Sequence, residues 1–263
     1  MDYDYIECGD CLTLMKELPD NSVDLVVTSP PYDNLRTYNG YTFDFENIAK
    51  ELFRIMKKGG VCVWVVSDAT INGSETGTSF RQALYFKECG FNLHDTMIWE
   101  KPSFTATGTL KVRYASVFEY MFVFSKDKPK TFHPIKDRKN KYAGAKKYGT
   151  IRQKDGSLKP KSNIGKEYAE YGQRFNVWHM PQEMSNRTGH PAVFPVQLAK
   201  DHIVSWSDEG DVVLDPFLGS GTTAVAAVQT NRHYIGYEIS EEYFDIACRR
   251  LDEVEGALNV STV

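Results

Sequence analysis

Hydrophobic and polar positions follow two kinds of periodic pattern, one typical of strands and one of helices, along the first 125 residues of the chain. Short apolar or alternating runs, typical of β-strands, cover residues 3–7, 23–28, 61–67, 93–99 and 117–125. Between them, residues 45–57 and 80–88 carry apolar side chains at helical spacing and are followed by glycines. Strands alternating with helices predict an α/β fold with a mostly parallel sheet. Because a loop separates the last two strands, we expect them to form an antiparallel hairpin at one edge.

The alternation of strand-like and helix-like segments is absent between residues 126 and 176 and resumes near residue 194. The middle segment is rich in Lys, Gly and Tyr and poor in branched aliphatic residues. After it, the spacing predicts a helix, a strand, a helix, a strand and a helix over residues 196–205, 212–214, 222–229, 234–238 and 241–253. We therefore predict one large α/β domain, made of residues 1–125 and 177–263 and interrupted by an insert of residues 126–176.

The insert differs from the rest of the chain in charge. From Lys126 to Arg174 there are 15 Lys and Arg against five Asp and Glu, whereas the other residues include 16 against 30. A basic block on an acidic body indicates a segment that faces a polyanion. The alternative is a solvated, lysine-rich insertion without a partner.

The remaining composition disfavours several classes of protein. The longest unbroken apolar run, residues 61–66, is too short to span a bilayer, and the acidic N-terminus has no signal-peptide pattern. We therefore expect an intracellular, cytoplasmic protein. The five cysteines are an odd number in mostly apolar surroundings, which favours reduced thiols. Cys8 and Cys11 have the spacing of a metal knuckle but lack a second pair, so no metal site is predicted.

The most informative segment is the turn Thr28-Ser29-Pro30-Pro31-Tyr32, which follows the apolar run 23–27. Two consecutive prolines restrict two φ angles and remove two N–H donors, which leaves a rigid turn whose backbone carbonyls can accept hydrogen bonds. A hydroxyl, a carbonyl and an aromatic ring are thus presented together at a strand end. This combination suits a planar molecule with an NH2 group, of which a nucleobase is the obvious example.

A second turn, at residues 215–223, reads Asp-Pro-Phe-Leu-Gly-Ser-Gly-Thr-Thr and lies between a predicted strand and a predicted helix. Ligands of open α/β sheets bind at this end of the strands, where glycines allow close approach and a helix N-terminus offers N–H groups. Glu238 ends the next strand, where an acidic residue typically holds ribose hydroxyls. Without a third glycine or a P-loop lysine, the turn favours a ribose-bearing ligand that has no pyrophosphate. A tight strand–helix connection is the alternative.

Together, the two turns resemble those of the DNA amino-methyltransferases, which move a methyl group from S-adenosyl-L-methionine to an exocyclic base nitrogen. The order of catalytic turn, basic insert and cofactor turn resembles the circularly permuted β group of this family. The similarity covers residues 1–125 and 177–254 and leaves the insert unmatched. It implies a Rossmann-like methyltransferase sheet, S-adenosyl-L-methionine as cofactor and double-stranded DNA as substrate.

The resemblance also implies roles for individual residues. The catalytic residues are Ser29, Pro30, Pro31 and Tyr32, and the cofactor-binding residues are Asp10, His190, Phe194, Asp215, Phe217, Gly219, Gly221, Thr222 and Glu238. Asp10 would contact the adenine, Asp215 the methionine amino group, and the segment around His190 the methionine moiety. Many relatives are more polar where this chain has Ala192-Val193-Phe194. The structural alternatives are a helix cap for Asp10, a core ring for Phe217 and a loop residue for His190.

The chemistry implied for the catalytic turn is activation of an amine. Its lone pair is delocalised into the base, so hydrogen bonds from its N–H groups to the Ser29 hydroxyl and the Pro30 carbonyl would draw the nitrogen toward tetrahedral geometry. Methylation at ring carbon C5 requires a cysteine after a proline, and the sequence has none. Ser29 favours cytosine N4 over adenine N6, as the resemblance implies. An RNA methyltransferase and a catalytically silent DNA-binding relative are the less favoured alternatives.

Contacts with DNA follow from the same interpretation. A duplex base must be flipped out of the stack, and Tyr32 would stack on it. Lys and Arg of the insert would supply phosphate affinity, and the DNA-binding candidates, chosen by residue type, are Arg36, Arg138, Arg152 and Arg174. As partners we expect double-stranded DNA, a second copy of the chain and a cognate restriction nuclease, and no membrane.

Overall fold

The computed structural model describes residues 2–31, 43–103, 110–182 and 194–261, with side chains as far as Ala257. The chain divides into two compact units. Unit 1 comprises Met1–His133 and Asn176–Val263, and unit 2 comprises Pro134–Phe175. Residues 126–133, which lie in the predicted insert, pack within unit 1.

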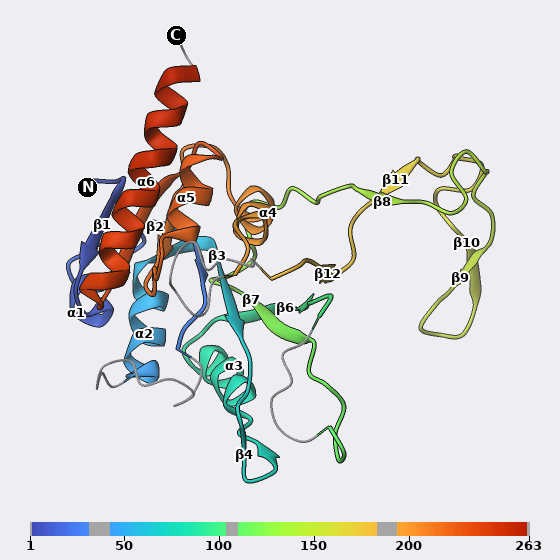
Figure 1. The fold of residues 1–263 in the computed structure, drawn as a ribbon. Helices are drawn as coiled ribbons and strands as arrows, with labels where there is room; N and C mark the ends of the chain where they lie inside the picture. Colours follow the sequence, from blue (N-terminus) through green and yellow to red (C-terminus); the bar gives the residue numbers. More distant parts are fainter. Residues whose placement is uncertain (1, 32–42, 104–109, 183–193, 262–263) are drawn as a thin grey trace. The chain divides into compact units, whose positions relative to one another are not determined.

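Unit 1 is built on an eight-stranded sheet with the strand order β1-β14-β13-β2-β3-β7-β6-β12 (Figure 1). The strands are β1 (Tyr5–Cys8), β2 (Val23–Thr28), β3 (Met56–Val66), β6 (Asn92–Glu100), β7 (Phe118–Ser125), β12 (Val177–His179), β13 (Val212–Asp215) and β14 (His233–Glu238). Neighbouring strands are parallel, except that β7 is antiparallel to both β3 and β6. The predicted fold class, a mostly parallel α/β sheet with an antiparallel hairpin, is confirmed.

Two local features differ from the sequence prediction. β12 was not expected, and it pairs in parallel with β6, so the β6–β7 hairpin lies one strand inside the edge of the sheet. A three-residue strand is too short to produce a periodic signal. The helix predicted to reach residue 57 ends at Ile55, because the backbone of Met56 is already extended and begins β3.

Helices cover both faces of the sheet (Figure 1). One face packs against α1 (Cys11–Met15), α2 (Phe45–Ile55) and α3 (Thr78–Glu88), and the other against α4 (Val196–Trp206), α5 (Thr222–Val228) and α6 (Glu241–Ser261). A small hairpin of β4 (Thr70–Ile71) and β5 (Ser74–Glu75) precedes α3. None of the described helices is both long and apolar enough to cross a membrane.

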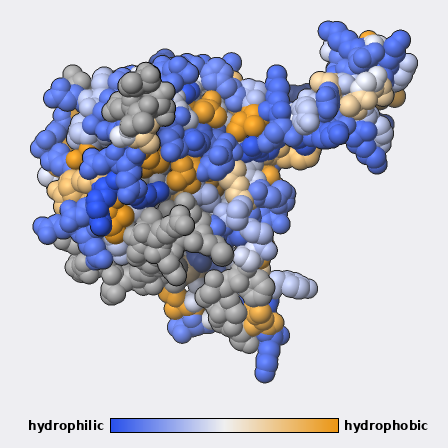
Figure 2. All heavy atoms as spheres, turned by 45° about the horizontal axis from the view of Figure 1, so that its top comes forward, coloured by the Kyte–Doolittle hydropathy of each residue, from blue (hydrophilic) through white to orange (hydrophobic). Residues whose placement is uncertain are grey.

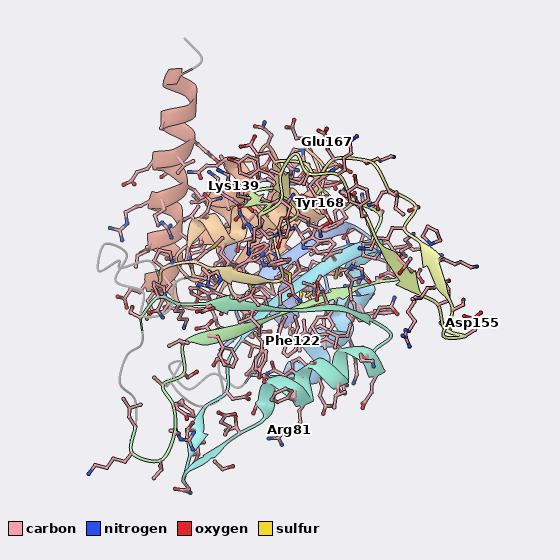
Figure 3. The ribbon with its side chains drawn as sticks, turned by 90° about the vertical axis from the view of Figure 1, so that its right-hand side faces the viewer. Arg81, Phe122, Lys139, Asp155, Glu167 and Tyr168 are labelled. Atoms are coloured by element: carbon pink, nitrogen blue, oxygen red, sulfur yellow. The ribbon has the colours of Figure 1, made fainter. Side chains whose placement is uncertain are left out.

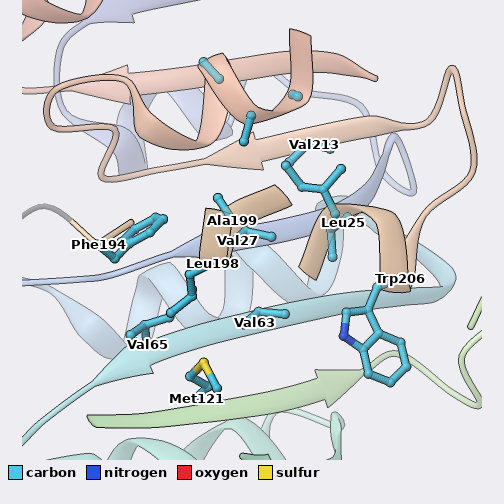
Figure 4. Close-up of a cluster of buried hydrophobic side chains, with 14 of the residues drawn as sticks. Leu25, Val27, Val63, Val65, Met121, Phe194, Leu198, Ala199, Trp206 and Val213 are labelled. Atoms are coloured by element: carbon cyan, nitrogen blue, oxygen red, sulfur yellow. The ribbon is translucent and has the colours of Figure 1, made fainter. Parts of the chain in front are cut away.

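Each face of the sheet has its own buried cluster. Successive strand residues point to opposite faces, so Val26 joins the cluster beneath α2 and Val27 joins the cluster beneath α4. Figure 4 shows the cluster on the α4 side, and Figure 3 shows Phe122, from the other cluster, between β7 and α3. The strands are therefore held from both sides, which fixes the position of the turns at their ends.

Unit 2 contains only short antiparallel strands. β8 (Arg138–Lys139) pairs with β11 (Tyr171–Gly172), and β9 (Thr150–Arg152) pairs with β10 (Leu158–Pro160). Every residue from 134 to 175 is at least partly exposed to solvent. The visible surface of this unit, at the right of Figure 2, is mainly hydrophilic. Unit 2 therefore has no hydrophobic core of its own.

Candidate active site

The two turns singled out in the sequence leave the sheet at the same edge. β2 and β13 are adjacent parallel strands, with Leu25 opposite Val213 and Val26 opposite Leu214. Because parallel neighbours end at a common edge, the proline turn after β2 lies beside the glycine turn after β13. The sheet thus brings together two segments that are far apart in the chain.

A buried hydrogen bond joins the two turns directly. The Thr28 hydroxyl donates to Asp215 Oδ1 over 2.6 Å, and the Phe217 backbone N–H donates to the same oxygen over 3.0 Å. Asp215 is only 2% exposed, and this burial, partly offset by its hydrogen bonds, raises the pKa of Asp215 to about 6. A carboxylate with so little water around it gains strongly from contact with a cation.

A second hydrogen bond strengthens this junction. The hydroxyl of Thr223, in the first turn of α5, donates to the Val27 carbonyl over 3.0 Å. Neither Thr28 nor Thr223 was among the predicted site residues, although both lie in the turns singled out in the sequence. No local pattern could indicate their partners, because those partners lie on another strand or turn and become neighbours only through the sheet.

Glu238, at the end of β14, anchors the glycine turn. Its Oε2 accepts the Gly219 N–H over 2.7 Å, and its Oε1 accepts the Ser240 N–H over 2.9 Å. Burial raises the pKa of Glu238, although the two N–H groups act in the opposite direction. Each carboxylate oxygen can accept a further hydrogen bond, as contact with ribose hydroxyls would require.

Gly221 is required by its backbone and by its packing. It caps α5 with a φ of +85°, in the left-handed region, and a Cβ at this position would lie 3.1 Å from Ala247 Cβ on α6. Arg250, also on α6, donates to the Ser220 carbonyl over 2.6 Å and to Thr222 Oγ1 over 3.3 Å. α6 therefore supports the glycine turn, and the Thr222 hydroxyl contacts this arginine.

Replacing Gly221 by alanine is expected to destabilise the protein by about 1–3 kcal/mol, because a close contact with Ala247 adds to the strain of a positive φ. Gly210→Ala is the matched control: Gly210 has a φ of +80°, and no described atom lies within 4 Å of its ideal Cβ position. Urea unfolding curves of both variants separate strain from packing. Equal destabilisation of the two would show that packing against α6 is unimportant.

A depression of about 540 Å³ lies at the carboxyl ends of β1 and β14, lined by Cys8, Gly9, Asp10 and residues 239–242. This volume falls within the range of small-molecule sites, about 300–1,000 Å³. Asp10 also caps α1, since its Oδ1 accepts from the Thr13 backbone N–H and hydroxyl, both at 2.9 Å. Asp10 thus has the structural role considered as the alternative and also lines the depression where the adenine was predicted.

The two phenylalanines predicted at the cofactor are packed into the protein. Phe194 is 8% exposed and belongs to the cluster on the α4 side (Figure 4). Phe217 contacts Phe43 and Trp64 edge to face, with ring centroids 5.6 and 6.0 Å away. Both rings are therefore held in place by neighbours in the core.

Part of the predicted site lies within the described residues. Ser29 and Pro31 are half-buried and Pro30 is buried, at the end of β2. Tyr32, Arg36 and His190 lie outside the described residues.

A family model described as DNA methylase, for N6 and N4 methyltransferases, matches residues 23–249. The chain belongs to the DNA amino-methyltransferases. The methyl donor of this family of methyltransferases is S-adenosyl-L-methionine. Two solved structures that share the fold, at 24% and 23% identity and with TM-scores of 0.63 and 0.64, contain it. The cofactor and the family predicted from the two turns are thereby confirmed.

Individual relatives agree with the family. The methyltransferase is 57% identical over 248 residues to the orphan methyltransferase M.BamHII of Bacillus amyloliquefaciens, covering 90% of this chain and 92% of the relative. It is 30% identical over 262 residues to the DNA adenine methyltransferase YhdJ of Escherichia coli K12, covering 93% and 81%. The cytosine-N4-specific PvuII DNA methyltransferase shares the fold, with a TM-score of 0.70, 23% identity and coverage of 95% and 86%.

Three of the arginines predicted to bind DNA lie in unit 2 of the methyltransferase. Arg174 forms an ion pair with Asp137, with Nε 2.9 Å from Oδ2, and this hydrogen bond lowers the pKa of Asp137. Arg138 donates from Nε to the Gln173 carbonyl over 3.0 Å. Arg152 is exposed on β9. Two of the three guanidinium groups are therefore engaged within unit 2.

Two lysines at the start of the predicted insert also have internal partners. Lys130 Nζ lies 2.8 Å from Asp24 Oδ1. Lys126 donates to the Phe53 and Met56 carbonyls over 2.7 and 2.9 Å. These ammonium groups are engaged within unit 1, so the basic charge that remains for a polyanion is concentrated after residue 133.

Proposed function

We propose that this chain transfers a methyl group from S-adenosyl-L-methionine to the exocyclic amine of a base flipped out of double-stranded DNA, and that this base is cytosine, methylated at N4. The observation that carries the proposal is the hydrogen bond from Thr28 to Asp215. It ties the turn that would hold the amine to the turn that would hold the cofactor. Residues from both turns can then act on one reacting pair.

The residues at this edge of the sheet fit the cofactor in three places. The buried Asp215 carboxylate would bind the methionine ammonium, Glu238 the ribose hydroxyls, and the depression beside Asp10 the adenine. When bound, the cofactor supplies an electrophilic methyl group on its sulfonium. Gly219 and Gly221 allow the backbone to approach this ligand closely, because neither carries a side chain.

The proline turn would prepare the amine. The Ser29 hydroxyl oxygen and the Pro30 carbonyl each accept one N–H of the amine, which localises the lone pair on nitrogen. Pro30 and Pro31 hold these acceptors in place because their φ angles are restricted. Tyr32 stacks on the flipped base, which offsets the cost of unstacking by about 1–3 kcal/mol.

Cytosine N4 is proposed because Ser29 occupies the first position of the proline turn, the residue that the resemblance associates with N4-cytosine enzymes. The second candidate, adenine N6, has its own support, since one relative is named a DNA adenine methyltransferase. Serine oxygen can accept from either amine, so the two candidates use the same residues.

Mass spectrometry of nucleosides tests the proposal. The chain is expressed in a host that lacks its own base methylation, with Ser29→Ala expressed in parallel as the control. We expect N4-methylcytosine in DNA from the first culture and much less from the second. N6-methyladenine without N4-methylcytosine would show that the target base is adenine and not cytosine. The absence of both products would contradict methylation of DNA.

Unit 2 is proposed as the DNA-binding segment. Residues 134–175 include 12 Lys and Arg against four Asp and Glu. Their contacts with phosphates would supply affinity that depends strongly on salt and little on sequence. Arg36, close to the proline turn in the chain, would contact phosphate beside the flipped nucleotide.

The proposal includes the motif order and the partners. The proline turn precedes the glycine turn in the chain, which supports the circularly permuted β arrangement. Phe80 and Leu84, one turn apart on α3 and both exposed, support a homodimer, which sedimentation velocity would reveal. A cognate restriction nuclease stays a prediction, and M.BamHII is itself named an orphan methyltransferase.

A further inference from the structure

Unit 2 is one long, irregular β-ribbon that folds back at a single turn. Backbone hydrogen bonds continue the pairing beyond the named strands, from Arg174 to Ile135, Asn140 to Glu170, Lys147 to Lys166, Lys161 to Gly149 and Gln153 to Ser157. With the β8–β11 and β9–β10 pairs, these bonds connect residues 135–153 to residues 157–174. Residues 154–156 form the turn, and Figure 3 shows Asp155 there, between β9 and β10.

At the end of the ribbon where the chain enters and leaves unit 2, two arginines hold the two strands together. The Arg174 ion pair with Asp137 crosses the two strands, and the Arg138 guanidinium stacks over the Phe175 ring, 4.4 Å from its centroid. These contacts join residues near the beginning of unit 2 to residues near its end. Arg138 and Arg174 are therefore structural at this end.

The β9–β10 end is built differently. Its turn is tight, because Asp155 Oδ1 accepts from the Ser157 backbone N–H at 2.9 Å and from the Ser157 hydroxyl at 2.7 Å. The apolar side chains of Ile151 and Leu158 are 52% and 60% exposed. A two-stranded ribbon exposed in this way is marginally stable alone and has both faces open to a partner.

Arg152, exposed on β9, differs from the other two arginines of the ribbon in its contacts. Among the described residues, no hydrogen bond or ion pair engages its guanidinium group. Arg152 lies opposite Leu158, and Thr150 lies opposite Pro160. Because opposite residues share a face and successive residues alternate, these four side chains form one face of the ribbon. That face combines the guanidinium donors of Arg152 with the apolar groups of Leu158, Pro160 and Thr150.

We infer that the β9–β10 end of unit 2 enters the major groove of the substrate DNA and that Arg152 reads a guanine there. The inference rests on the proposed function, since it takes DNA as the partner. Arginine donates to guanine O6 and N7 together, and an apolar side chain such as Leu158 contacts the methyl group of a neighbouring thymine.

The dimensions favour the major groove. Two paired strands lie about 4.8 Å apart before their side chains are counted. The major groove, about 12 Å wide, admits such a ribbon, whereas the minor groove is only about 6 Å wide. This end of the ribbon also has the positive charge that binding to DNA requires, because between residues 150 and 160 it carries Arg152, Lys154 and Lys159, all exposed, against one acidic residue, Asp155.

Sequencing that detects modified bases tests this inference in cells that express the wild type, Arg152→Ala, Arg152→Lys or Lys159→Ala. The wild type defines the methylated motif. Both Arg152 variants are expected to accept other bases at one guanine of the motif, and their preference for cognate over mismatched sites should fall about tenfold or more. Lys159→Ala is the matched control on the opposite face of the same ribbon. This variant should keep the methylated motif. The slope of the logarithm of the binding constant against the logarithm of the salt concentration should become shallower by about one, which corresponds to one lost phosphate contact.

An unchanged motif in Arg152→Ala, with a cognate preference within twofold of the wild type, would overturn the inference. The same holds if Arg152→Ala alters only self-association, because the ribbon would then contact a second copy. Where a variant methylates too little DNA for sequencing, competition between cognate and scrambled duplexes for the purified protein measures its preference for the cognate site. A wild type that modifies no DNA would instead contradict the proposed function.

Discussion

Replacing Ser29 by alanine is expected to lower the rate of methyl transfer about 100-fold or more, with the affinity for S-adenosyl-L-methionine changed less than twofold. The alanine lacks the oxygen that would accept an N–H of the target amine, so the lone pair of the nitrogen stays delocalised in the base. The cofactor site is built from residues of other turns and should be retained. Single-turnover methylation and calorimetric cofactor binding measure the two quantities separately.

Ser67→Ala is the matched control for Ser29→Ala. Ser67 follows β3, the next strand of the sheet, and is half-buried like Ser29. Its variant should methylate DNA at nearly the wild-type rate. A rate above one third of the wild-type value in Ser29→Ala, or an equal loss in both variants, would remove Ser29 from the catalytic residues.

Replacing Asp24 by alanine is expected to destabilise the protein by about 2–4 kcal/mol. The Asp24 side chain is 1% exposed and accepts from Lys57 at 2.7 Å, from Lys130 at 2.8 Å and from the Val212 N–H at 3.0 Å. It therefore connects β2, β3, the segment before unit 2 and β13. Its loss leaves the buried Val212 N–H without this acceptor, whereas the two lysines can turn toward water. Urea unfolding measures the difference.

The effect of Asp24 should depend on pH. Burial would raise the pKa of Asp24, but hydrogen bonds from Lys130 and Lys57 outweigh it and hold the pKa below its ordinary value of 3.8. A carboxylate with a lowered pKa stabilises the folded protein above its unfolded pKa and loses this contribution as the pH falls through the folded pKa. The stability difference between wild type and Asp24→Ala should therefore shrink below about pH 4.

Asp20→Ala controls for the general loss of a carboxylate. Asp20 pairs with Arg54 at 2.7 Å, but its side chain is 68% exposed. A surface pair of this kind is expected to contribute less than about 1 kcal/mol. If Asp24→Ala were no more destabilising than Asp20→Ala, the buried network would not support the sheet.

Long periodic segments were predicted well because their signal is local. The strand over residues 23–28 has the same bounds in the structure, since a run of buried apolar residues between turn residues has few other interpretations. Short elements such as α1 and β12 were missed, because five or three residues carry no clear period. The end of α2 was misplaced because the extended backbone of Met56 depends on its pairing with Val23, which periodicity cannot reveal.

The chemistry of the two turns could be read from the order of residues, because proline geometry, glycine freedom and the donors and acceptors of each side chain are properties of short segments. Those properties led to the family and its cofactor. The partners of these residues required the folded sheet: Thr28 meets Asp215 only because β2 and β13 are neighbours, and Lys130 meets Asp24 rather than a polyanion. Strand order results from the sum of burial and pairing energies over the whole chain, and no single segment contains it.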